Sequence, residues 1–526
     1  MQQTIDLKLT PEEAASDETV LHAIANKISI PLQHISGYTI LKRSIDARSR
    51  QPWINLKLFV SIKQPHPARE KINFRFQDVS KADQKVIIVG AGPAGLFAAL
   101  QLIESGIQPI LLERGKDVKS RRRDLAAMNK QGIVNPESNY CFGEGGAGTY
   151  SDGKLFTRSN KRGDIDRILH LFVHFGADEK ILYDAHPHIG TNKLPQIITA
   201  MREQIIESGG QVLFDKKVVD FRIKDNAISA VSTADGHVFD GAAVILATGH
   251  SARDIFYLLH EKKILIEAKP FALGVRAEHP QELIDQAQYK CDARGFYLPP
   301  ASYSLVQQVQ QVGVFSFCMC PGGIIAPAAT APGEIVVNGW SPSKRNNPYA
   351  NSGIVVQVQL KDVMNQRGLK NPDPLSLLNF QEEVEQRAFA AGGGDLQAPA
   401  QRMVDFCANK VSQSLPKCSY LPGITSADLS TVLPPFIHHA LQKAFVEFGK
   451  KMPARYGGKG YYTNEAVLVA TESRTSSPVR IPRDAQTLQH PQIKNLYPCG
   501  EGAGYAGGIV SAAMDGERVA KMIAGL

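Results

Sequence analysis

The ten residues Val86-Ile-Ile-Val-Gly-Ala-Gly-Pro-Ala-Gly95 decide the fold of this chain. A run of β-branched residues breaks at Gly90-x-Gly92-x-x-Gly95, and an apolar stretch follows from Leu96 to Ile103. This order predicts a buried strand, a tight glycine turn and the start of a helix. The first glycine permits the turn, the second lets a phosphate approach the main chain, and the third allows the helix to pack closely on the strand. The helix N-terminus would offer N–H groups and partial positive charge to that phosphate.

A second apolar strand is expected at Pro109–Leu112, and it ends in Glu113. Its distance from Gly95 is close to the roughly 20 residues that separate such a turn from a ribose-binding carboxylate. The uncharged run Val86–Ile103 is also just long enough to span a membrane. Its three glycines and Pro93 favour strand, turn and helix instead. The sequence therefore predicts a dinucleotide site.

Three later segments carry matching features. Residues 495–516 read as a strand, an acidic turn containing Glu501, a glycine pair and a small-residue helix. Residues 243–249, AVILATG, read as an apolar strand that ends in a small-residue turn, and residues 211–219 read as a further strand. In this order the segments resemble the FAD enzymes of the glutathione-reductase-like superfamily. In that superfamily the acid contacts the ribityl or pyrophosphate region and is usually Asp, whereas this chain has Glu501. A helix N-terminus at the pyrimidine edge would stabilise the negative charge of a reduced flavin.

A closer resemblance rests on four unusual segments. They are FGEGGAGTYSDGKL at 142–155, ATGHSARD at 247–254, FCMCPGG at 317–323 and ESRTSSPVR at 472–480. Their combination resembles a family of largely uncharacterised FAD-dependent dehydrogenases, loosely called NAD(FAD)-utilising dehydrogenases. The resemblance covers nearly the whole chain. It implies a flavoprotein fold and FAD, and it does not supply a substrate.

The expected FAD contacts come from all of these segments. They are Gly90, Gly92, Pro93, Ala94, Gly95, Glu113, Arg114, Arg121, Arg122, Gly145, Gly146, Ala147, Gly148, Val218, Ala247, Thr248, Gly249, Gly500, Glu501, Gly507, Gly508 and Ile509. Two other roles are open for the arginines: they could belong to a solvated loop and helix start, or they could bind the 2′-phosphate of NADPH. The loop Gly143–Gly153 is expected beside the flavin ring, because successive glycines allow close approach; a purely structural loop is the alternative.

His250 is the candidate catalytic residue, because imidazole exchanges protons near neutral pH. A capping or structural role is its alternative. Cys318 and Cys320 are expected to be small buried thiols, with a redox disulfide as the alternative. Arg276, Arg474 and Arg480 could hold a carboxylate or phosphate, and salt-bridge roles are equally open. No metal site and no covalent flavin attachment is indicated by the cysteine and histidine spacing.

Two other motifs are incomplete. Residues 148–154 match most of a P-loop, but Leu155 stands where a magnesium-binding hydroxyl is required. Residues 249–253 resemble a hydrolase elbow, but Arg253 stands where that motif needs glycine. Neither nucleoside-triphosphate nor hydrolase chemistry is predicted.

Length and composition fit a multi-domain globular protein. The chain has 526 residues, 43% apolar residues, seven cysteines and a net charge of +8. It shows no signal peptide, and scattered cysteines suggest a reducing, cytoplasmic location. We expect an α/β fold: a βαββ module (1–80), a Rossmann-like FAD-binding domain with a parallel sheet and ββα layers (81–268 and 455–526), and an inserted α+β substrate or cap domain (269–454).

The predicted function is that of an FAD-dependent oxidoreductase or dehydrogenase. Hydride or electrons would pass through flavin N5 between a reductant and a small organic substrate. NAD(P)H is a candidate transient reductant, because no second glycine-rich strand–acid unit is present. No membrane partner is expected, nucleic acid is not favoured, and the oligomeric state is undetermined. The alternatives are a tRNA-associated or other nucleic-acid-modifying flavoprotein, which the positive charge would suit, and a protein that uses FAD structurally.

Overall fold

Five short apolar strands form the parallel sheet that the glycine motif predicts. The computed structural model describes residues 1–157, 163–368, 370–454 and 458–525. The sheet has the order β22-β10-β4-β5-β6 and every neighbouring pair is parallel. Its strands are β4 (Lys85–Val89), β5 (Gln108–Leu112), β6 (Gln211–Leu213), β10 (Ala243–Leu246) and β22 (Leu496–Pro498). Because β5 and β10 flank β4 on opposite sides, the strand order reverses at β4, which is where open α/β sheets bind ligands.

The two faces of this sheet are covered differently. Val86 and Ile88 of β4 pack in one cluster with helices α2 (Pro93–Glu104), α4 (Ile165–His174), α5 (Leu194–Glu207) and α12 (Ile509–Ile523). Ile87 and Val89 point the other way and pack with the antiparallel sheet β7 (Val218–Lys224), β8 (Ala227–Thr233), β9 (Val238–Phe239) and with helix α6 (Arg253–Glu261). Helices on one face and β-strands on the other give the expected Rossmann-like arrangement.

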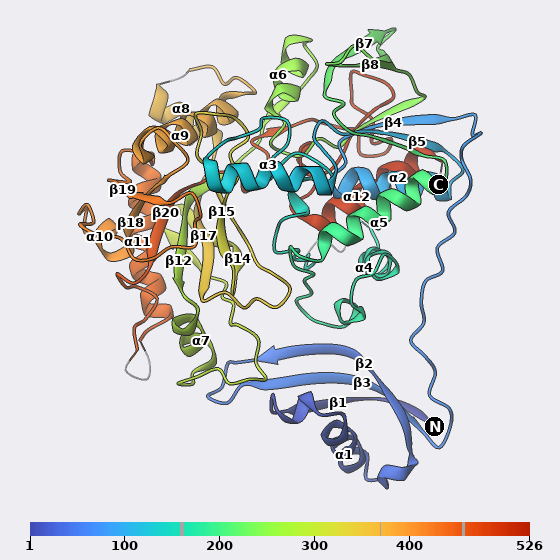
Figure 1. The fold of residues 1–526 in the computed structure, drawn as a ribbon, viewed down its shortest axis with the longest axis vertical. Helices are drawn as coiled ribbons and strands as arrows, with labels where there is room; N and C mark the ends of the chain where they lie inside the picture. The colour runs from blue at the N-terminus through green and yellow to red at the C-terminus, as the bar shows by residue number, and fades with distance from the viewer. Residues whose placement is uncertain (158–162, 369, 455–457, 526) are drawn as a thin grey trace.

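A second, seven-stranded sheet, called the inserted sheet below, lies on the left of Figure 1. Its order is β13-β14-β17-β12-β20-β18-β19, and β18 and β19 are its parallel pair. The strands are β12 (Phe271–Pro280), β13 (Val306–Val309), β14 (Val312–Cys320), β17 (Tyr349–Val358), β18 (Ala398–Arg402), β19 (Ile424–Ser426) and β20 (Val467–Glu472). The last of these follows residue 454, so this sheet takes one strand from the segment assigned to the FAD-binding domain.

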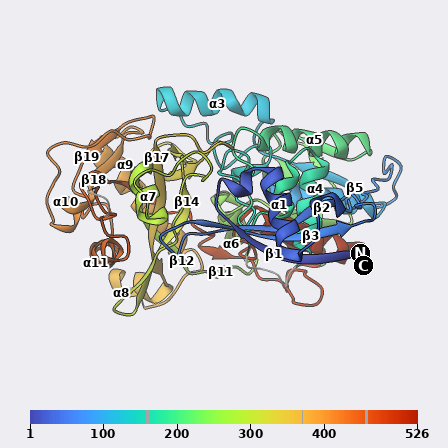
Figure 2. The ribbon, with the colours of Figure 1, turned by 90° about the horizontal axis from the view of Figure 1, so that it is seen from below.

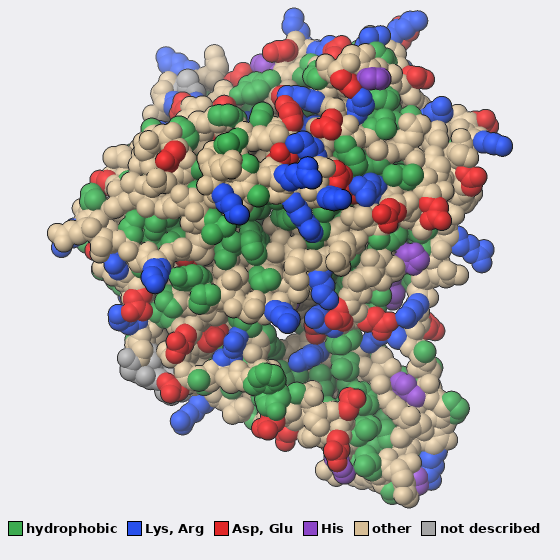
Figure 3. Space-filling model, viewed as in Figure 1, with side chains coloured by type: hydrophobic (Ala, Val, Ile, Leu, Met, Phe, Trp, Pro, Cys, Tyr) green, Lys and Arg blue, Asp and Glu red, His purple; other side chains and the backbone are tan. Residues whose placement is uncertain are grey.

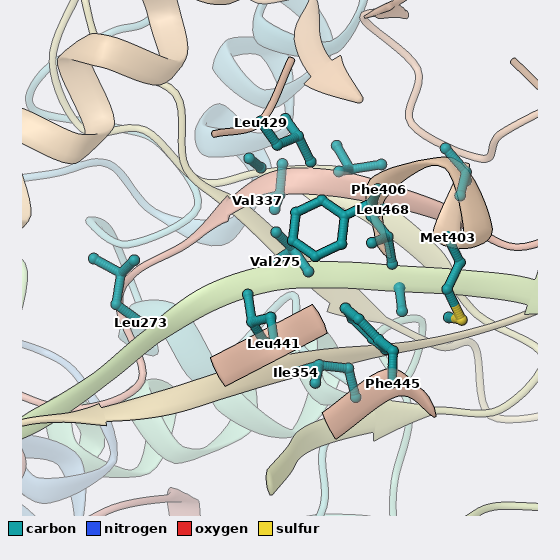
Figure 4. Packing of buried hydrophobic residues seen from close by; sticks show 14 of the residues in the cluster. Leu273, Val275, Val337, Ile354, Met403, Phe406, Leu429, Leu441, Phe445 and Leu468 are labelled. Atoms are coloured by element: carbon teal, nitrogen blue, oxygen red, sulfur yellow. The ribbon is translucent and has the colours of Figure 1, made fainter. Parts of the chain in front are cut away.

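Helices close over this sheet and bury its main core. Helix α11 (Pro435–Lys451) contributes Leu441 and Phe445 to a cluster with Val275 of β12 and Ile354 of β17, as Figure 4 shows. The remaining elements are α3 (Val118–Gln131), α7 (Gln281–Tyr289), α8 (Leu360–Arg367), α9 (Ser376–Gly392), α10 (Met403–Cys407), β11 (Glu267–Ala268), β15 (Ile324–Pro327), β16 (Val337–Trp340) and β21 (Val479–Arg480).

The N-terminal residues form the predicted βαββ module. Strands β1 (Gln2–Leu9), β2 (Ile35–Asp46) and β3 (Trp53–Ile62) make an antiparallel sheet of order β1-β3-β2, and helix α1 (Asp17–Ile28) packs with them in a separate core. Figure 1 shows this module below the rest of the molecule, joined to β4 by an extended segment, 63–84, and Figure 2 views the molecule from the side of the module. It touches the main body through β2, where the Arg43 amide donates to the Tyr183 carbonyl at 2.8 Å and the Ala185 amide donates to the Arg43 carbonyl at 2.9 Å.

The run Val86–Ile103 is divided between β4, the glycine turn and α2. The predicted strand, turn and helix are thereby confirmed. None of the helices in the described ranges combines the length and apolar character that a bilayer crossing requires.

Candidate active site

A cavity of about 380 Å³ opens beyond the carboxyl ends of β4, β5 and β10. It brings together most of the residues that the sequence singled out. Those in its lining are Gly90, Gly92, Pro93, Ala94, Glu113, Arg114, Gly146, Ala147, Gly148, Val218, Ala247, Thr248, Gly249, His250, Glu501, Gly507, Gly508 and Ile509. Five predicted residues are not part of this lining in the described structure: Gly95, Arg121, Arg122, Gly145 and Gly500.

Three glycines of the first turn have different tasks. Gly90 has a φ of +106°, and a Cβ there would lie 2.4 Å from the carbonyl oxygen of Ala247. A Cβ on Gly95 would lie 2.0 Å from the carbonyl oxygen of Gly90. Both positions therefore need glycine for the backbone to close. A Cβ on Gly92 would meet no described atom within 4 Å, since this residue faces the cavity at the N-cap of α2.

The other end of the chain supplies a second helix start. Gly508 is the N-cap of α12, and Gly507, Gly508 and Ile509 line the same cavity. A Cβ added to Gly507 or Gly508 would again find open space in the described structure. Two helix N-termini thus face one cavity, and glycines stand where each helix begins. Such a site can accept the phosphates and the ring of a bound dinucleotide close to the main chain.

Glu113 connects three loops at the rim. Its Oε2 atom accepts a 2.9 Å hydrogen bond from the Ala91 amide, and its Oε1 atom accepts 2.9 Å hydrogen bonds from the amides of Gly115 and Gly143. The side chain is buried and lines the cavity. The carboxylate at the end of β5 therefore holds the glycine turn and the 143–153 loop in position.

The arginines after Glu113 bind protein groups. Arg114 donates two hydrogen bonds to Asp254, at 2.9 and 2.8 Å, and one to Glu137 at 2.7 Å. Arg121 is fully buried and donates to four loop carbonyls at 2.8 to 3.0 Å, those of Asn139, Tyr140, Glu144 and Gly146. Arg122 is exposed on α3, where Lys and Arg side chains gather on the surface in Figure 3. The basic run therefore shapes the loop beside the cavity and continues onto the outer face of α3.

His250 and Glu501 lie side by side in the wall of the cavity. Its Nδ1 atom is 3.5 Å from Oε1 of Glu501, and both side chains are largely buried. The first residue follows β10 and the second follows β22, and these strands are neighbours in the parallel sheet. The fold thus places an acid beside the imidazole, which orients a proton-exchanging ring.

The seven-stranded sheet and its neighbours contribute the remaining wall. Phe317 and Cys318 come from β14, Asn338 from β16 of the small β15–β16 sheet, and Arg474 and Thr475 from the segment after β20. Lys154, the last residue of the incomplete P-loop match, also lines the cavity, as do Lys216 and Lys217, which were not among the predicted site residues. Lys216 and Lys217 could have been predicted from the sequence, because these two adjacent lysines directly precede the strand that supplies Val218.

Arg276 and Arg474, candidates for anion binding, instead form buried ion pairs. Arg276 donates to Glu472 at 2.7 Å. Arg474 forms a fork with Glu385 and also donates to Glu334 at 2.9 Å. Burial alone would raise the pKa of Glu385, but Arg253 and Arg474 outweigh it and hold that pKa at about 2. These guanidinium groups therefore stabilise the protein segments that form the cavity wall.

Comparisons with known proteins agree with this geometry. Residues 83–132 match the family described as "FAD binding domain", residues 270–475 match "FAD-dependent protein, C-terminal domain-like", and residues 1–61 match a domain of unknown function. The chain therefore contains an FAD-binding domain, and the pocket described above lies at its glycine turn.

Relatives extend over very different shares of the chain. An "Uncharacterized protein" from Clostridium beijerinckii is 38% identical over 518 residues, which is 95% of this chain and 94% of that protein. The thiamine thiazole synthase of Archaeoglobus fulgidus is 24% identical over 47% of this chain and 87% of its own. Among solved structures, the glycine oxidase of Bacillus cereus covers 84% of this chain and 95% of its own, with 14% identity and a TM-score of 0.29.

Proposed function

The chain belongs to the same family as that C. beijerinckii protein over nearly its full length, and on this premise we propose that it is an FAD-dependent oxidoreductase acting on a small organic molecule. The observation that carries the proposal is the convergence on one cavity of two segments that lie far apart in sequence, around Gly92 and Gly508. The N-termini of α2 and α12 face that cavity, and glycines leave it open.

Residues on the parallel-sheet side would hold the cofactor. Gly92 and the first turn of α2 would receive the pyrophosphate, and Glu113 would face the ribose of the adenosine. Val218 and the neighbouring Lys216 and Lys217 would lie toward the adenosine end, while Gly507 and Gly508 would face the flavin. When bound, FAD supplies two-electron transfer through flavin N5.

Arg121 would act on this site indirectly. Its four bonds to loop carbonyls fix the backbone between Asn139 and Gly146, which places Gly146 at the cavity. We therefore assign Arg121 to positioning of the loop rather than to direct phosphate binding.

His250 would move the proton that accompanies electron transfer. Glu501, 3.5 Å from Nδ1, favours a proton on that nitrogen, which leaves Nε2 as the atom that would exchange a proton with the substrate. Phe317 of β14, Asn338 of β16 and Thr475 after β20 would form the substrate side of the cavity. We also propose a cytoplasmic location, which the seven free thiols support.

The test is anaerobic reduction of the purified yellow protein. NADH and NADPH are mixed with it separately, and flavin absorbance at about 450 nm is followed in a stopped-flow instrument. Bleaching by either nucleotide is the expected result. His250→Gln should keep its FAD but slow the coupled turnover by about a hundredfold or more. An FAD-loaded protein that no donor bleaches, dithionite included, would contradict the oxidoreductase proposal and favour structural FAD.

A further inference from the structure

Two cysteines of β14 meet the cofactor cavity at an irregular point of the strand. The pairing of β14 with β17 shifts register between Phe317 and Cys320, and Cys318 adopts a positive φ of 46°. Such a conformation is unfavourable for a non-glycine residue and persists only where surrounding contacts fix it. Cys318 lines the cavity, whereas Cys320 is completely buried behind it.

A lysine from a distant loop contacts both sulfur atoms. The Nζ atom of Lys154 lies 3.8 Å from Sγ of Cys318 and 3.6 Å from Sγ of Cys320. The same ammonium is 3.4 Å from Asp152, whose carboxylate also accepts a 2.8 Å bond from Arg345. Neutral thiols are weak hydrogen-bond acceptors, so they compensate poorly for the desolvation of a lysine. A thiolate would compensate well.

The remaining charges around the pair favour the same ionisation. Arg276 donates from Nη1 to the Cys318 carbonyl at 3.4 Å, and its Nε atom is paired with Glu472. The Cys320 thiol donates to the Cys318 carbonyl at 3.3 Å. The proximity of that thiol, together with Lys154 and Arg276, lowers the pKa of the Cys318 thiol well below its ordinary value, against the opposing effects of burial and Asp152. The proximity of Cys318 and burial raise the pKa of the Cys320 thiol. The two thiols thus differ in both access and proton affinity.

Other roles for the cysteine pair fit less well. Among the described residues, no group of His, Cys, Asp and Glu side chains could hold a metal ion. Simple core packing would explain the buried Cys320. It would not explain why Cys318 adopts a strained backbone conformation, faces the cavity and contacts a lysine. Cys141 provides the contrast on the same cavity, since its Sγ donates to the Ala328 carbonyl.

We propose that Cys318 is a nucleophilic thiolate and Cys320 its resolving thiol, and that together they reduce small-molecule disulfides that enter the cavity. The Cys318 thiolate attacks one sulfur of the disulfide, forms a mixed disulfide and releases one thiolate. Cys320 then loses its proton to solvent and attacks the Cys318 sulfur, which forms the Cys318–Cys320 bond and releases the second thiolate. The two protein thiols are oxidised by two electrons and the small disulfide is reduced by two. This activity goes beyond the proposed flavin chemistry and does not depend on it.

The first experiment measures ionisation directly on the full-length protein with its bound cofactor. Iodoacetamide is added between pH 7 and 9, and the alkylation rate of each cysteine is read by peptide mass mapping. An ordinary thiol slows about twentyfold over this range as the pH falls. Cys318 should slow less than about threefold in the folded protein and should return to ordinary behaviour in the urea-unfolded chain. An ordinary pH profile for folded Cys318 would overturn the proposal.

The second experiment tests the lysine. Lys154→Met should reduce the alkylation rate of Cys318 at pH 7 by about tenfold, because only about a tenth of a thiol is ionised once its pKa lies one unit above the pH. Lys119→Met, on the exposed face of α3, is the matched control and should leave the rate unchanged. Equal rates in the two variants would exclude Lys154 as the group that stabilises the thiolate.

The third experiment follows the resolving step. One equivalent of 5,5′-dithiobis(2-nitrobenzoate) should release two equivalents of thionitrobenzoate from the wild-type protein and leave a mapped Cys318–Cys320 disulfide. Cys320→Ser should release one equivalent and retain the mixed disulfide on Cys318, whereas Cys141→Ser should behave as wild type. A wild-type reaction that stops at one equivalent, or that modifies Cys141 first, would contradict the dithiol. Flavin bleaching by a donor is scored separately, so loss of either activity leaves the other measurable.

Discussion

Arg474 and Glu385 are joined by a buried two-point fork. Nε of Arg474 is 3.1 Å from Oε1 of Glu385, and Nη2 is 2.9 Å from Oε2. The arginine follows β20 and the glutamate belongs to α9, so this pair ties the end of a strand at the cavity to the helix that covers the inserted sheet. Two parallel hydrogen bonds between charged groups fix orientation as well as distance.

Arg474→Gln should therefore lower the free energy of unfolding by about 3 kcal/mol, because it leaves the two buried carboxylates of Glu334 and Glu385 to share the guanidinium of Arg253. Urea unfolding followed by circular dichroism measures the change. Arg48→Gln is the control, since Arg48 pairs with Asp46 through a side chain that is 90% exposed. Similar unfolding midpoints for the two variants would show that the fork is not a stabilising contact.

Gly92→Val should separate cofactor binding from folding. The new side chain would enter open space in the protein but occupy the path of the pyrophosphate, so we expect FAD affinity to fall about tenfold to hundredfold, equivalent to one lost charged hydrogen bond. Gly313→Val in β14 is the matched control, because a Cβ there meets only side-chain oxygens at 3.9 Å. Calorimetric titration of the apoproteins with FAD distinguishes the two. Unchanged affinity for Gly92→Val would remove this glycine from the phosphate site.

Gly516→Ala should affect both stability and cofactor binding. A Cβ on this residue of α12 would lie 2.1 Å from the carbonyl oxygen of Ala94 in the first turn of α2. Relief of that overlap should cost about 1 to 3 kcal/mol and move the helix start that faces the cavity. Gly392→Ala creates a comparable overlap, 1.9 Å from the Gln397 carbonyl oxygen, at the end of α9. It should lose stability with FAD affinity unchanged, and a parallel loss of affinity would argue against a local effect of α12.

Glu278 should make stability depend on pH. Burial raises the pKa of this β12 carboxyl to about 7, although Ser419 hydrogen-bonds to it. The folded protein then binds this proton more tightly than the unfolded chain, whose pKa is close to 4.5. The resulting stability is complete below about pH 4.5 and is lost as the pH rises through about 7.

Glu278→Gln should remove this dependence. Relative to wild type, the variant should gain up to roughly 3 kcal/mol between pH 5 and 8, at about 1.4 kcal/mol for each pKa unit. Urea unfolding at both pH values measures it, with the exposed Glu12→Gln as control. Parallel stability curves for wild type and Glu278→Gln would mean that Glu278 does not titrate in this range.

The parts of the site that follow local rules were predictable from the sequence. The turn at Gly90, Gly92 and Gly95 depends on residues within one strand and one helix start, and its steric demands are visible in the residue types. The order of Glu113, Ala247 and Glu501 along the chain also indicated which strand ends meet, because parallel strands place their carboxyl ends at one edge.

Contacts between distant segments were not predictable in this way. The basic residues after Glu113 suggested phosphate ligands, but the buried guanidinium of Arg121 satisfies four carbonyls of a loop whose path no local pattern specifies. The segment 269–454 looked rich in loops, yet six of its strands build a seven-stranded sheet in which, apart from the β13–β14 hairpin, the paired strands are separated by longer stretches of sequence. The meeting of Lys154 with Cys318 depends on that sheet and was likewise invisible.

The packing of α12 against α2 has a consequence for biosynthesis. The ribosome makes the Gly90 turn early and the Gly507–Gly508 turn near the end, an interval on the order of 20 to 80 seconds at usual rates of translation. During that time the nascent polypeptide holds one half of a nucleotide cradle and an uncovered helix face. The nucleotide cradle is therefore completed only after the Gly507–Gly508 turn has left the ribosome, and chaperones have that whole interval in which to shield the exposed surface.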